Sequence, residues 1–320
     1  MSVDLHAPYV LGFDAGGTKT VCLLADLEGH VLDEARTNGA NLQAVGELEV
    51  ETTLHEVMDL VIGDRMLPPS AIVLGMAGVD RADDAQVMRR VLRRIGAKAR
   101  TLITNDALIA LVAAIGHDPG IVLIAGTGSI AYGRNARDEA ARAGGWGYVL
   151  GDEGSGYWIG RHALRAVVRA SDGRGHPTAM TPLVLAHFGV THPDDLVRVI
   201  YDGALRPPAI AAVARAVQAA AEEHDELALQ ILTVGARELA SSARSVIARL
   251  GLRDEVFDVV LSGGVMHAVP RLAAEVEAQV QQLAPKCRVQ LLQREPAYGA
   301  VALAVAEATG GARVPSYATA

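Results

Sequence analysis

One pattern occurs twice in this chain: an apolar strand, a glycine turn that carries a hydroxyl group, and a second strand. Residues 9–13 (Tyr-Val-Leu-Gly-Phe) precede Asp14-Ala-Gly-Gly-Thr18, and residues 121–125 (Ile-Val-Leu-Ile-Ala) precede Gly126-Thr-Gly-Ser129. Glycine has no Cβ, so such turns can approach a bound group closely. The repeat lies in the pattern rather than in residue identity, and it predicts two related halves.

The elements between and after these turns indicate an α/β fold. Apolar strands are expected at 71–76, 101–104 and 257–261, and helices at 47–62, 83–94, 107–115, 153–170, 181–187, 193–199, 208–223, 227–250, 269–283 and 297–307. Alternating strands and helices form layered α/β structure. The 320 residues exceed what one hydrophobic core usually holds. We therefore expect an N-terminal lobe (1–118), a C-terminal lobe (119–296), a helix (297–308) packed back on the first lobe, and a frayed tail (309–320).

Composition argues against several classes of binding partner and cofactor, namely nucleic acid, membranes and cysteine-bound metals. The net charge of −8 gives no global attraction to nucleic acid or an anionic membrane. No apolar run reaches the roughly 20 residues of a membrane helix, and no leader-like segment opens the chain, so a cytoplasmic protein is expected. Cys22 and Cys287 are far apart and lack CxxC spacing, which argues against zinc or an iron–sulfur cluster within one chain.

The first turn suits a phosphate. Gly16, Gly17 and Thr18 offer backbone N–H groups and a hydroxyl, followed by Lys19. Asp14 would repel a polyphosphate directly, but it suits a place beside hydrated Mg²⁺. An ordinary hairpin explains the same residues by turn geometry. The turn is not a Walker loop, because no GxxxxGKS/T sequence occurs.

The second turn repeats that design. Gly126, Thr127 and Gly128 again follow an apolar strand and offer backbone donors with a hydroxyl. One glycine turn is weak support for a ligand site. Two turns of one design, one in each half, are what a clamp on phosphates requires.

Asn105-Asp106 stands where a strand ends and a helix begins. Either residue suits a helix N-cap, which is a sufficient structural explanation. Ligands of α/β sheets also bind at strand ends. A carboxylate there can accept the proton of an attacking hydroxyl, so Asp106 is a candidate general base.

Residues 144–156 contain six glycines, a tryptophan and two acids. This composition is poor for a core element and suits a ligand loop. Asp152 could hold sugar hydroxyls and Trp146 could pack on a sugar face, beside Gly144 and Gly145. The alternative is a glycine-rich hinge, with Glu153 in the first turn of the next helix.

Smaller candidates lie in other loops. Gly263 and Gly264 follow a strand and permit close approach of a nucleotide, although tight connections of this kind are common. Asn41 is a candidate for sugar recognition and Gly78 lies in a loop after a strand, but each is also an ordinary turn residue.

Taken in order, these motifs resemble the N-acetylglucosamine kinase and BadF/BadG/BcrA/BcrD ATPase family, within the superfamily of actin-like ATPases and sugar kinases. The resemblance extends over about residues 9–308, and its most specific part is Gly-Asp-Glu-Gly-Ser (151–155) after Gly-Gly-Trp (144–146). It implies a two-lobed actin-like ATPase (ribonuclease H-like) fold with a duplicated mixed sheet. It also implies an ATP-dependent, magnesium-requiring amino-sugar kinase that is commonly a homodimer.

The resemblance assigns roles to the candidates. ATP would contact the two glycine turns and the 263–264 pair, with Mg²⁺ positioned through water by Asp14. The sugar would contact Asn41, Gly78, Asp106, Gly144, Gly145, Trp146 and Asp152. Asp106 would deprotonate the 6-hydroxyl of N-acetylglucosamine in a cleft that closes between the lobes and excludes water.

Two alternatives stay open at this point. Glucosamine and N-acetylmuramic acid differ from N-acetylglucosamine in one or two substituents, which the sequence does not discriminate. The same family also contains ATPases that activate partner enzymes. Those carry paired cysteines for a shared [4Fe–4S] cluster, in loops where neither Cys22 nor Cys287 of this chain is expected.

Overall fold

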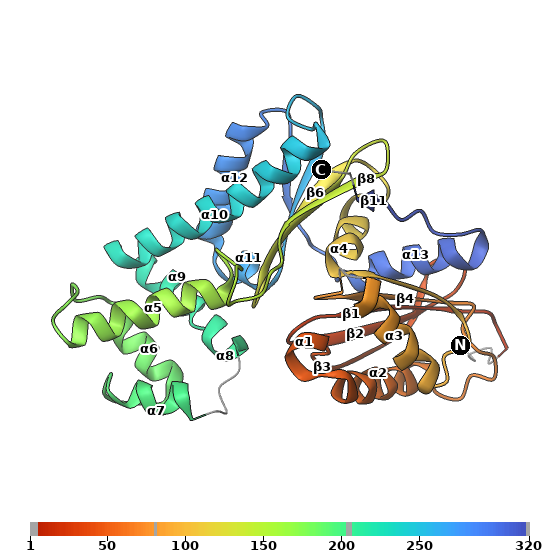
Figure 1. Ribbon diagram of the computed structural model, residues 1–320, viewed down its shortest axis with the longest axis horizontal. Coiled ribbons are helices and arrows are strands. Elements are labelled where there is room, and N and C mark those ends of the chain that lie inside the picture. Colours follow the sequence, from red (N-terminus) through yellow and green to blue (C-terminus); the bar gives the residue numbers. More distant parts are fainter. Residues whose placement is uncertain (1–5, 80–81, 203–206, 318–320) are drawn as a thin grey trace. The chain divides into compact units, whose positions relative to one another are not determined.

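A computed structural model describes residues 6–79, 82–202 and 207–317. It divides into two compact units (Figure 1). The first unit runs to Gly120 and takes up 136–139 and 292–317 later in the chain. The second consists of 121–135 and 140–291.

The first unit is built on a mixed sheet in the order β3-β2-β1-β4-β5. Strand β1 is antiparallel to β2 and parallel to β4, which is parallel to β5. Both faces of β1 and β4 are covered, which explains their continuous apolar runs. The strands are β1 (Val10–Ala15), β2 (Lys19–Ala25), β3 (Val31–Asn38), β4 (Ala71–Met76) and β5 (Arg100–Asn105).

Helices cover both faces of this sheet. In Figure 1, α2 and α3 lie on one face and α4 and α13 on the other. Two glycines make the second layer possible. A Cβ on Gly12 would lie 2.5 Å from the Val301 nitrogen, and one on Gly299 would lie 1.9 Å from the Ile109 oxygen. The helices are α1 (Leu42–Val45), α2 (Glu47–Ile62), α3 (Ala82–Arg94), α4 (Asp106–Ile115) and α13 (Ala297–Thr309).

The second unit contains a sheet in the order β10-β9-β6-β7-β8. Its strands are β6 (Gly120–Ala125), β7 (Ser129–Arg134), β8 (Glu139–Gly144), β9 (Asp258–Ser262) and β10 (Arg288–Leu291). Its helices are α5 (Gly156–Ser171), α6 (Met180–Phe188), α7 (Asp195–Tyr201), α8 (Pro207–Ala211), α9 (Ala214–Glu222), α10 (Glu226–Leu250), α11 (Gly264–Ala268) and α12 (Pro270–Leu283).

The long helix α10 organises the core of the second unit, and it packs on β7, α5, α9 and α12. Its ends are well defined. The Asp225 carboxylate accepts a hydrogen bond from the Ala228 N–H at 2.8 Å, and Gly251 ends the helix in the left-handed conformation (φ 67°). Buried aliphatic side chains of α10, such as Leu232, Leu239 and Val246, join the core cluster under the sheet.

Three sequence expectations differ from the structure. The single helix expected over 208–223 is two helices, α8 and α9, because residues 212–213 interrupt it with a turn. The helix expected from residue 153 begins at Gly156, with Ser155 as its N-cap. Strand β8 was not predicted, because its alanine-rich sequence carries no strand signal and it forms by pairing with β7.

The tail is also more ordered than the expected frayed end. After α13, the short strand β11 (Ser316–Tyr317) forms, and the Ser316 N–H donates to the Asp138 carbonyl at 3.0 Å. The Arg313 guanidinium pairs with the Asp138 carboxylate. The expectation also included residues 318–320, which lie outside the described residues.

No helix within residues 6–79, 82–202 and 207–317 is long and apolar enough to cross a membrane.

Candidate active site

The strands of the first unit bring its candidate residues to one edge of the sheet. Ala15, Met76 and Asn105 are in register at the carboxyl ends of β1, β4 and β5. The first glycine turn, Gly78 and Asp106 therefore all leave the sheet at this edge. Asn41 follows β3, whose last residue, Asn38, pairs with Lys19 beside the turn.

The first glycine turn is exposed but tied down by backbone contacts. The Gly16 N–H donates to the Lys19 carbonyl and the Ala40 N–H donates to the Gly16 carbonyl, both at 3.0 Å. A Cβ on Gly39 would lie 2.5 Å from the Gly17 backbone, so the chain after β3 lies directly against the turn. Gly17 and Thr18 nevertheless remain exposed as residues.

Asp14 is a strongly perturbed carboxylate at this edge. It is 8% exposed, and its pKa is raised to about 7, first by burial and then by the charge of Asp106. Glu295 raises the pKa further and Lys19 lowers it. Two carboxylates that disfavour each other's charge are a pair that a cation would stabilise.

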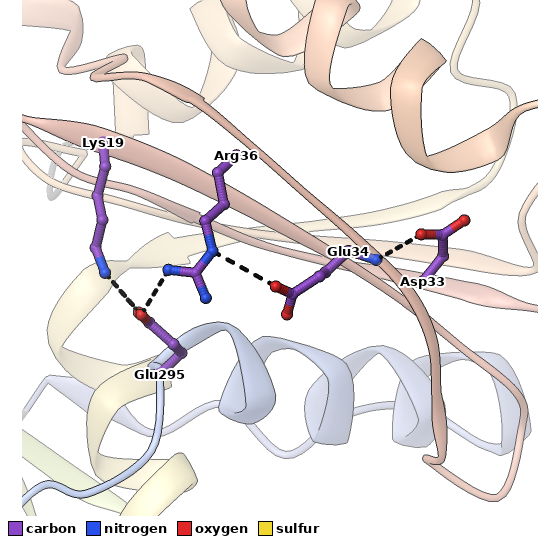
Figure 2. A network of polar contacts seen from close by, with 5 residues as sticks. All are labelled: Lys19, Asp33, Glu34, Arg36 and Glu295. Carbon is purple, nitrogen blue, oxygen red and sulfur yellow. Dashed lines mark hydrogen bonds and ion pairs between the residues drawn. The ribbon is translucent and has the colours of Figure 1, made fainter.

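Lys19, which follows the turn, belongs to a charged network with Arg36 and Glu295 (Figure 2). Its ammonium group lies 2.7 Å from one Glu295 oxygen and 2.9 Å from the other. The Arg36 guanidinium donates to the same carboxylate at 3.0 Å, and these two cations lower the pKa of Glu295. The amine predicted to contact ATP is thus held by a carboxylate just before α13.

Asn105 and Asp106 have different positions at the start of α4. The Asn105 amide oxygen accepts a hydrogen bond from the Leu108 N–H at 2.7 Å, so Asn105 is the N-cap of α4. Its amide nitrogen donates to the Tyr317 hydroxyl at 3.3 Å. Asp106 is the first residue of the helix and is half-buried, with its charge felt at Asp14. The cap explains Asn105 but not Asp106.

Asn41 and Gly78 occupy turns at the same edge. The Asn41 carbonyl accepts the Val45 N–H at 3.1 Å and so begins the short helix α1. Gly78 has φ +80°, which explains a glycine there without reference to a ligand.

In the second unit, the Gly126–Ser129 turn is fixed mainly by backbone hydrogen bonds. The Gly126 N–H donates to the Gly128 carbonyl at 2.9 Å, and the Gly126 carbonyl accepts from the Gly156 N–H at 2.9 Å. The Thr127 carbonyl accepts from the Tyr157 N–H at 3.3 Å. The start of α5 therefore holds this turn in one conformation.

Asp152 links this turn to the glycine-rich loop. Its carboxylate accepts hydrogen bonds from the Ser129 and Gly147 N–H groups, which lower its pKa, although burial raises that pKa more. A Cβ on Gly128 would lie 2.6 Å from the Asp152 Oδ2 atom. Asp152 is 7% exposed and adopts φ +61°, which is uncommon outside glycine.

The loop around Trp146 presents its ring outward. Gly144, Gly145 and Gly147 all have φ between +71° and +81°. The Gly145 N–H donates to the Ser129 carbonyl at 2.9 Å, which places the loop beside the second turn. Trp146 is 57% exposed, with the Arg142 guanidinium 5.3 Å from its ring centre.

The 263–264 pair also lies at the second turn. Gly263 has φ +97°, and a Cβ on it would lie 2.4 Å from the Ala125 carbonyl oxygen. Only glycine fits between β9 and the end of β6. Gly264 begins α11, and a Cβ there would meet nothing within 4 Å.

No sequence motif pointed to Glu295. It stands in an ordinary loop, 276 residues from Lys19, and only the fold brings them together. The backbone contacts of Asp152 were missed for the same reason. The positive φ at a non-glycine residue is visible only in the structure.

The carboxylates of the first unit fit a magnesium ion with few protein ligands. No cluster of three or more His, Cys, Asp or Glu side chains that could hold a metal occurs in the described part of the chain. Mg²⁺ usually keeps several waters and binds one or two carboxylates together with substrate phosphates. Asp14, buried and next to the charge of Asp106, is suited to that arrangement.

A family model described as the BadF/BadG/BcrA/BcrD ATPase family matches residues 11–304. The chain belongs to this family. The resemblance identified from the motifs is thereby confirmed, and membership brings the use of ATP.

Curated relatives agree over nearly the whole chain. An N-acetylmuramic acid/N-acetylglucosamine kinase of Clostridium acetobutylicum is 34% identical and aligns with 93% of this chain and 99% of the relative. An N-acetyl-D-glucosamine kinase of Dictyostelium discoideum is 32% identical over 92% of this chain and 97% of its own length.

Solved structures agree on the fold. A protein assigned as an N-acetylglucosamine kinase, from Chromobacterium violaceum, is 28% identical with a TM-score of 0.74, and covers 92% of this chain and 98% of its own. A glucokinase of the ROK family from Streptomyces griseus, solved with glucose and AMPPNP, has a TM-score of 0.57 at 18% identity, over 92% of this chain and 98% of its own. The predicted actin-like ATPase fold of the sugar kinases is confirmed.

Proposed function

We propose that this protein transfers the γ-phosphoryl group of ATP to the 6-hydroxyl of N-acetylglucosamine, with Asp106 as the general base. The chain is an ATP-dependent sugar kinase, as its family and its relatives over more than nine tenths of its length indicate. The substrate and the base are the proposal.

The position of Asp106 is the observation that carries the proposal. Asn105 caps α4, so N-capping does not account for the acid at position 106. Asp106 stands at the carboxyl edge of a sheet, where α/β proteins bind ligands. A carboxylate there can accept the hydroxyl proton as the oxygen attacks phosphorus.

We propose that phosphates bind at the two glycine turns. In the first unit, the Gly17 and Thr18 N–H groups and the Thr18 hydroxyl would donate, with Lys19 beside them, while Gly16 shapes the turn through its bond to the Lys19 carbonyl. In the second unit, Thr127 and Gly128 would donate, Gly126 would shape the turn through its bond to the Gly128 carbonyl, and Gly263 and Gly264 would lie near the adenosine. Donors fixed before the reaction stabilise developing charge without reorganisation.

Asp14 would hold Mg²⁺ through its water shell. When bound, the ion would neutralise charge on the phosphate oxygens. With a pKa of about 7, Asp14 is partly protonated near neutral pH. A neighbouring cation would favour its charged form.

The proposed sugar contacts come from both units. Trp146 offers an exposed ring face for an apolar sugar surface, with Gly144 and Gly145 giving the loop its turn. The Asp152 carboxylate has capacity for a sugar hydroxyl beside its two backbone donors. Asn41 and Gly78 lie at the same sheet edge as Asp106. A homodimer remains a prediction, which light scattering coupled to size-exclusion chromatography tests.

The alternative of an ATPase that activates a partner enzyme requires thiolates for a shared cluster. Cys22 lies inside β2 with no exposed surface, and Cys287 is 8% exposed. Burial raises the pKa of both thiols, which disfavours the thiolate that ligates iron. These observations favour the kinase.

The test is a coupled ADP-release assay with MgATP against N-acetylglucosamine, glucosamine and N-acetylmuramic acid. Asp106→Asn should lower kcat by ~10²–10⁴ with little change in melting temperature. Asp83→Asn, at an exposed position on α3, is the matched control and should keep wild-type rates.

Sugar-dependent ADP release that survives Asp106→Asn would reject Asp106 as the base. Release that depends on another amino sugar would keep the mechanism and change the substrate. ADP release that is the same with every sugar and with none would reject the kinase proposal.

A further inference from the structure

A groove in the second unit lies outside the groups assigned so far. It encloses about 450 Å³ between α5, α7 and the start of α8. This volume is within the range of small-molecule sites. Its lining consists of Tyr148, Tyr157, Arg161, Leu164, Arg165, Val168, Leu196, Val197, Ile200, Tyr201, Pro207 and Ile210.

The charge of the groove is of one sign. Arg161 and Arg165 are one turn apart on α5, so both face the same side of the helix. Neither makes a hydrogen bond or an ion pair with any residue in the described part of the chain. The lining contains no Asp or Glu. The pKa of His162, between the two arginines in the sequence, is lowered first by burial and then by the charges of Arg161 and Arg165. An anion placed here would meet two uncompensated guanidinium groups.

The walls of the groove are apolar and aromatic. Tyr148 is 46% exposed and Tyr201 is 81% exposed, so both present ring surface to the groove and to solvent. Leu164, Val168 and Ile200 supply aliphatic surface. A ligand that combines an anionic group with a small apolar group matches this lining better than a bare inorganic ion does.

The groove is continuous with the glycine-rich loop. Tyr148 is two residues after Trp146, and its ring lies 4.7 Å from that of Tyr157 in α5. The preceding N–H, that of Gly147, is bound to the Asp152 carboxylate. A ligand held on the loop at Trp146 and Asp152 would therefore have the groove beside it, on the Tyr148 side.

We propose that this groove is a subsite for a carboxylate-bearing substituent of the amino sugar, held by Arg161 and Arg165. This inference rests on the proposed function. N-acetylmuramic acid is N-acetylglucosamine with a lactyl ether, which joins a carboxylate to a methyl group. Guanidinium groups bind carboxylates with charge-assisted, often bidentate hydrogen bonds, and the aliphatic wall accepts the methyl group.

The test compares two sugars in four proteins: wild type, Arg161→Gln, Arg165→Gln and the control Arg169→Gln. Arg169 is exposed one turn further along α5 and does not line the groove. Each groove variant should raise KM for N-acetylmuramic acid about tenfold, as expected for loss of a hydrogen bond to a charged group. In each groove variant, KM for N-acetylglucosamine should rise by no more than about twofold, which is a fifth of the rise for N-acetylmuramic acid. The control Arg169→Gln should have wild-type KM values for both sugars.

Calorimetry without ATP gives a second measurement that does not depend on turnover. Wild type should bind N-acetylmuramic acid, and each groove variant should bind it about tenfold more weakly. If no sugar supports ADP release, the kinase proposal fails, while calorimetry still decides whether the groove binds the carboxylate.

Three results would overturn the inference. One is equal loss of affinity for both sugars, which would indicate general damage to the loop. Another is no binding of N-acetylmuramic acid to a protein that phosphorylates N-acetylglucosamine. The third is a change of oligomeric state in the variants with unchanged sugar affinities, which would make the groove a contact between copies of the chain.

Discussion

The two glycine turns follow the same kind of strand but are held in different ways. The first is surrounded by charge: a buried Asp14, the neighbouring Asp106, and a Lys19 paired with Glu295. The second is held by uncharged backbone bonds to the start of α5, with one carboxylate, Asp152, behind it.

This difference separates two environments for a glycine turn. Both turns are tied by backbone hydrogen bonds, which do not titrate, and the second turn also rests against the Asp152 carboxylate, whose pKa burial raises. The first turn has, in addition, partly exposed ion pairs, which respond to salt, and a carboxylate with a pKa of about 7, which responds to pH. We therefore expect pH and ionic strength to act mainly through the first unit, and changes of backbone shape to act mainly through the second.

The largest expected effect is on the pH dependence of stability, through Asp14→Asn. The folded pKa of Asp14 is about 7 against an ordinary 3.8, so the folded state holds this proton more tightly than the unfolded chain. Stability is then lost as pH rises from about 4 to about 7, by about 4 kcal/mol at 1.36 kcal/mol per pH unit. Asp14→Asn should escape this loss.

Urea denaturation of both proteins from pH 4 to pH 9 measures the effect. The stability of the variant relative to wild type should grow up to about pH 7 and then level off. Asp83→Asn, on the surface of α3, should show no such trend. A difference that is constant over the whole range would mean that Asp14 titrates normally and that the first turn is no more pH-sensitive than the second.

The sequence predicted the strand before each glycine turn and the candidate Asp106, but not the side-chain contacts around them. Strands β1 and β6 were predictable because both are buried and read as apolar runs before glycine. Asp106 was predictable as a candidate because it opens a helix at a strand end. The assignment of the N-cap to Asn105 rather than Asp106 needed the side-chain geometry.

Other parts of the site depend on contacts between residues far apart in the chain. Glu295 reaches Lys19 only because α13 packs on β1, which a glycine at position 12 permits. Strand β8 exists because β7 offers it a pairing edge, against the local preference of an alanine-rich segment. Local sequence holds no signal for such tertiary effects.

A smaller change in stability is expected from adding a methyl group to each turn, by Gly128→Ala in the second and Gly17→Ala in the first. The new methyl group at position 128 would lie 2.6 Å from Asp152 Oδ2, and that carboxylate is anchored by two backbone N–H groups. At position 17 it would meet nothing within 4 Å. We expect Gly128→Ala to lower stability by about 1–3 kcal/mol, and Gly17→Ala to change it by under about 0.5 kcal/mol.

Thermal unfolding of the two variants decides this comparison, and Gly264→Ala serves as a control within the second unit, since a Cβ there also has open space. Equal losses from Gly128→Ala and Gly17→Ala would show that backbone packing does not distinguish the turns.

The smallest expected effect is that of Glu295→Gln, and it tests whether charge governs the first turn. Lys19 and Arg36 are each about half exposed, so the lost ion pairs should lower stability by no more than about 1 kcal/mol. The informative change is at Asp14. Removing Glu295 takes away a negative charge that raises the pKa of Asp14 and leaves Lys19 to lower it.

The pH at which stability stops falling should therefore shift downward in Glu295→Gln, and the shift should shrink in 0.5 M salt because screening weakens these interactions. Glu34→Gln is the matched control: its carboxylate is 3.7 Å from Arg36, and it is not among the groups that shift Asp14. An unchanged pH profile in Glu295→Gln, with the expected profile for Asp14→Asn, would assign the perturbation of Asp14 to burial and Asp106 alone. The network of Figure 2 would then hold the turn in place without setting its charge.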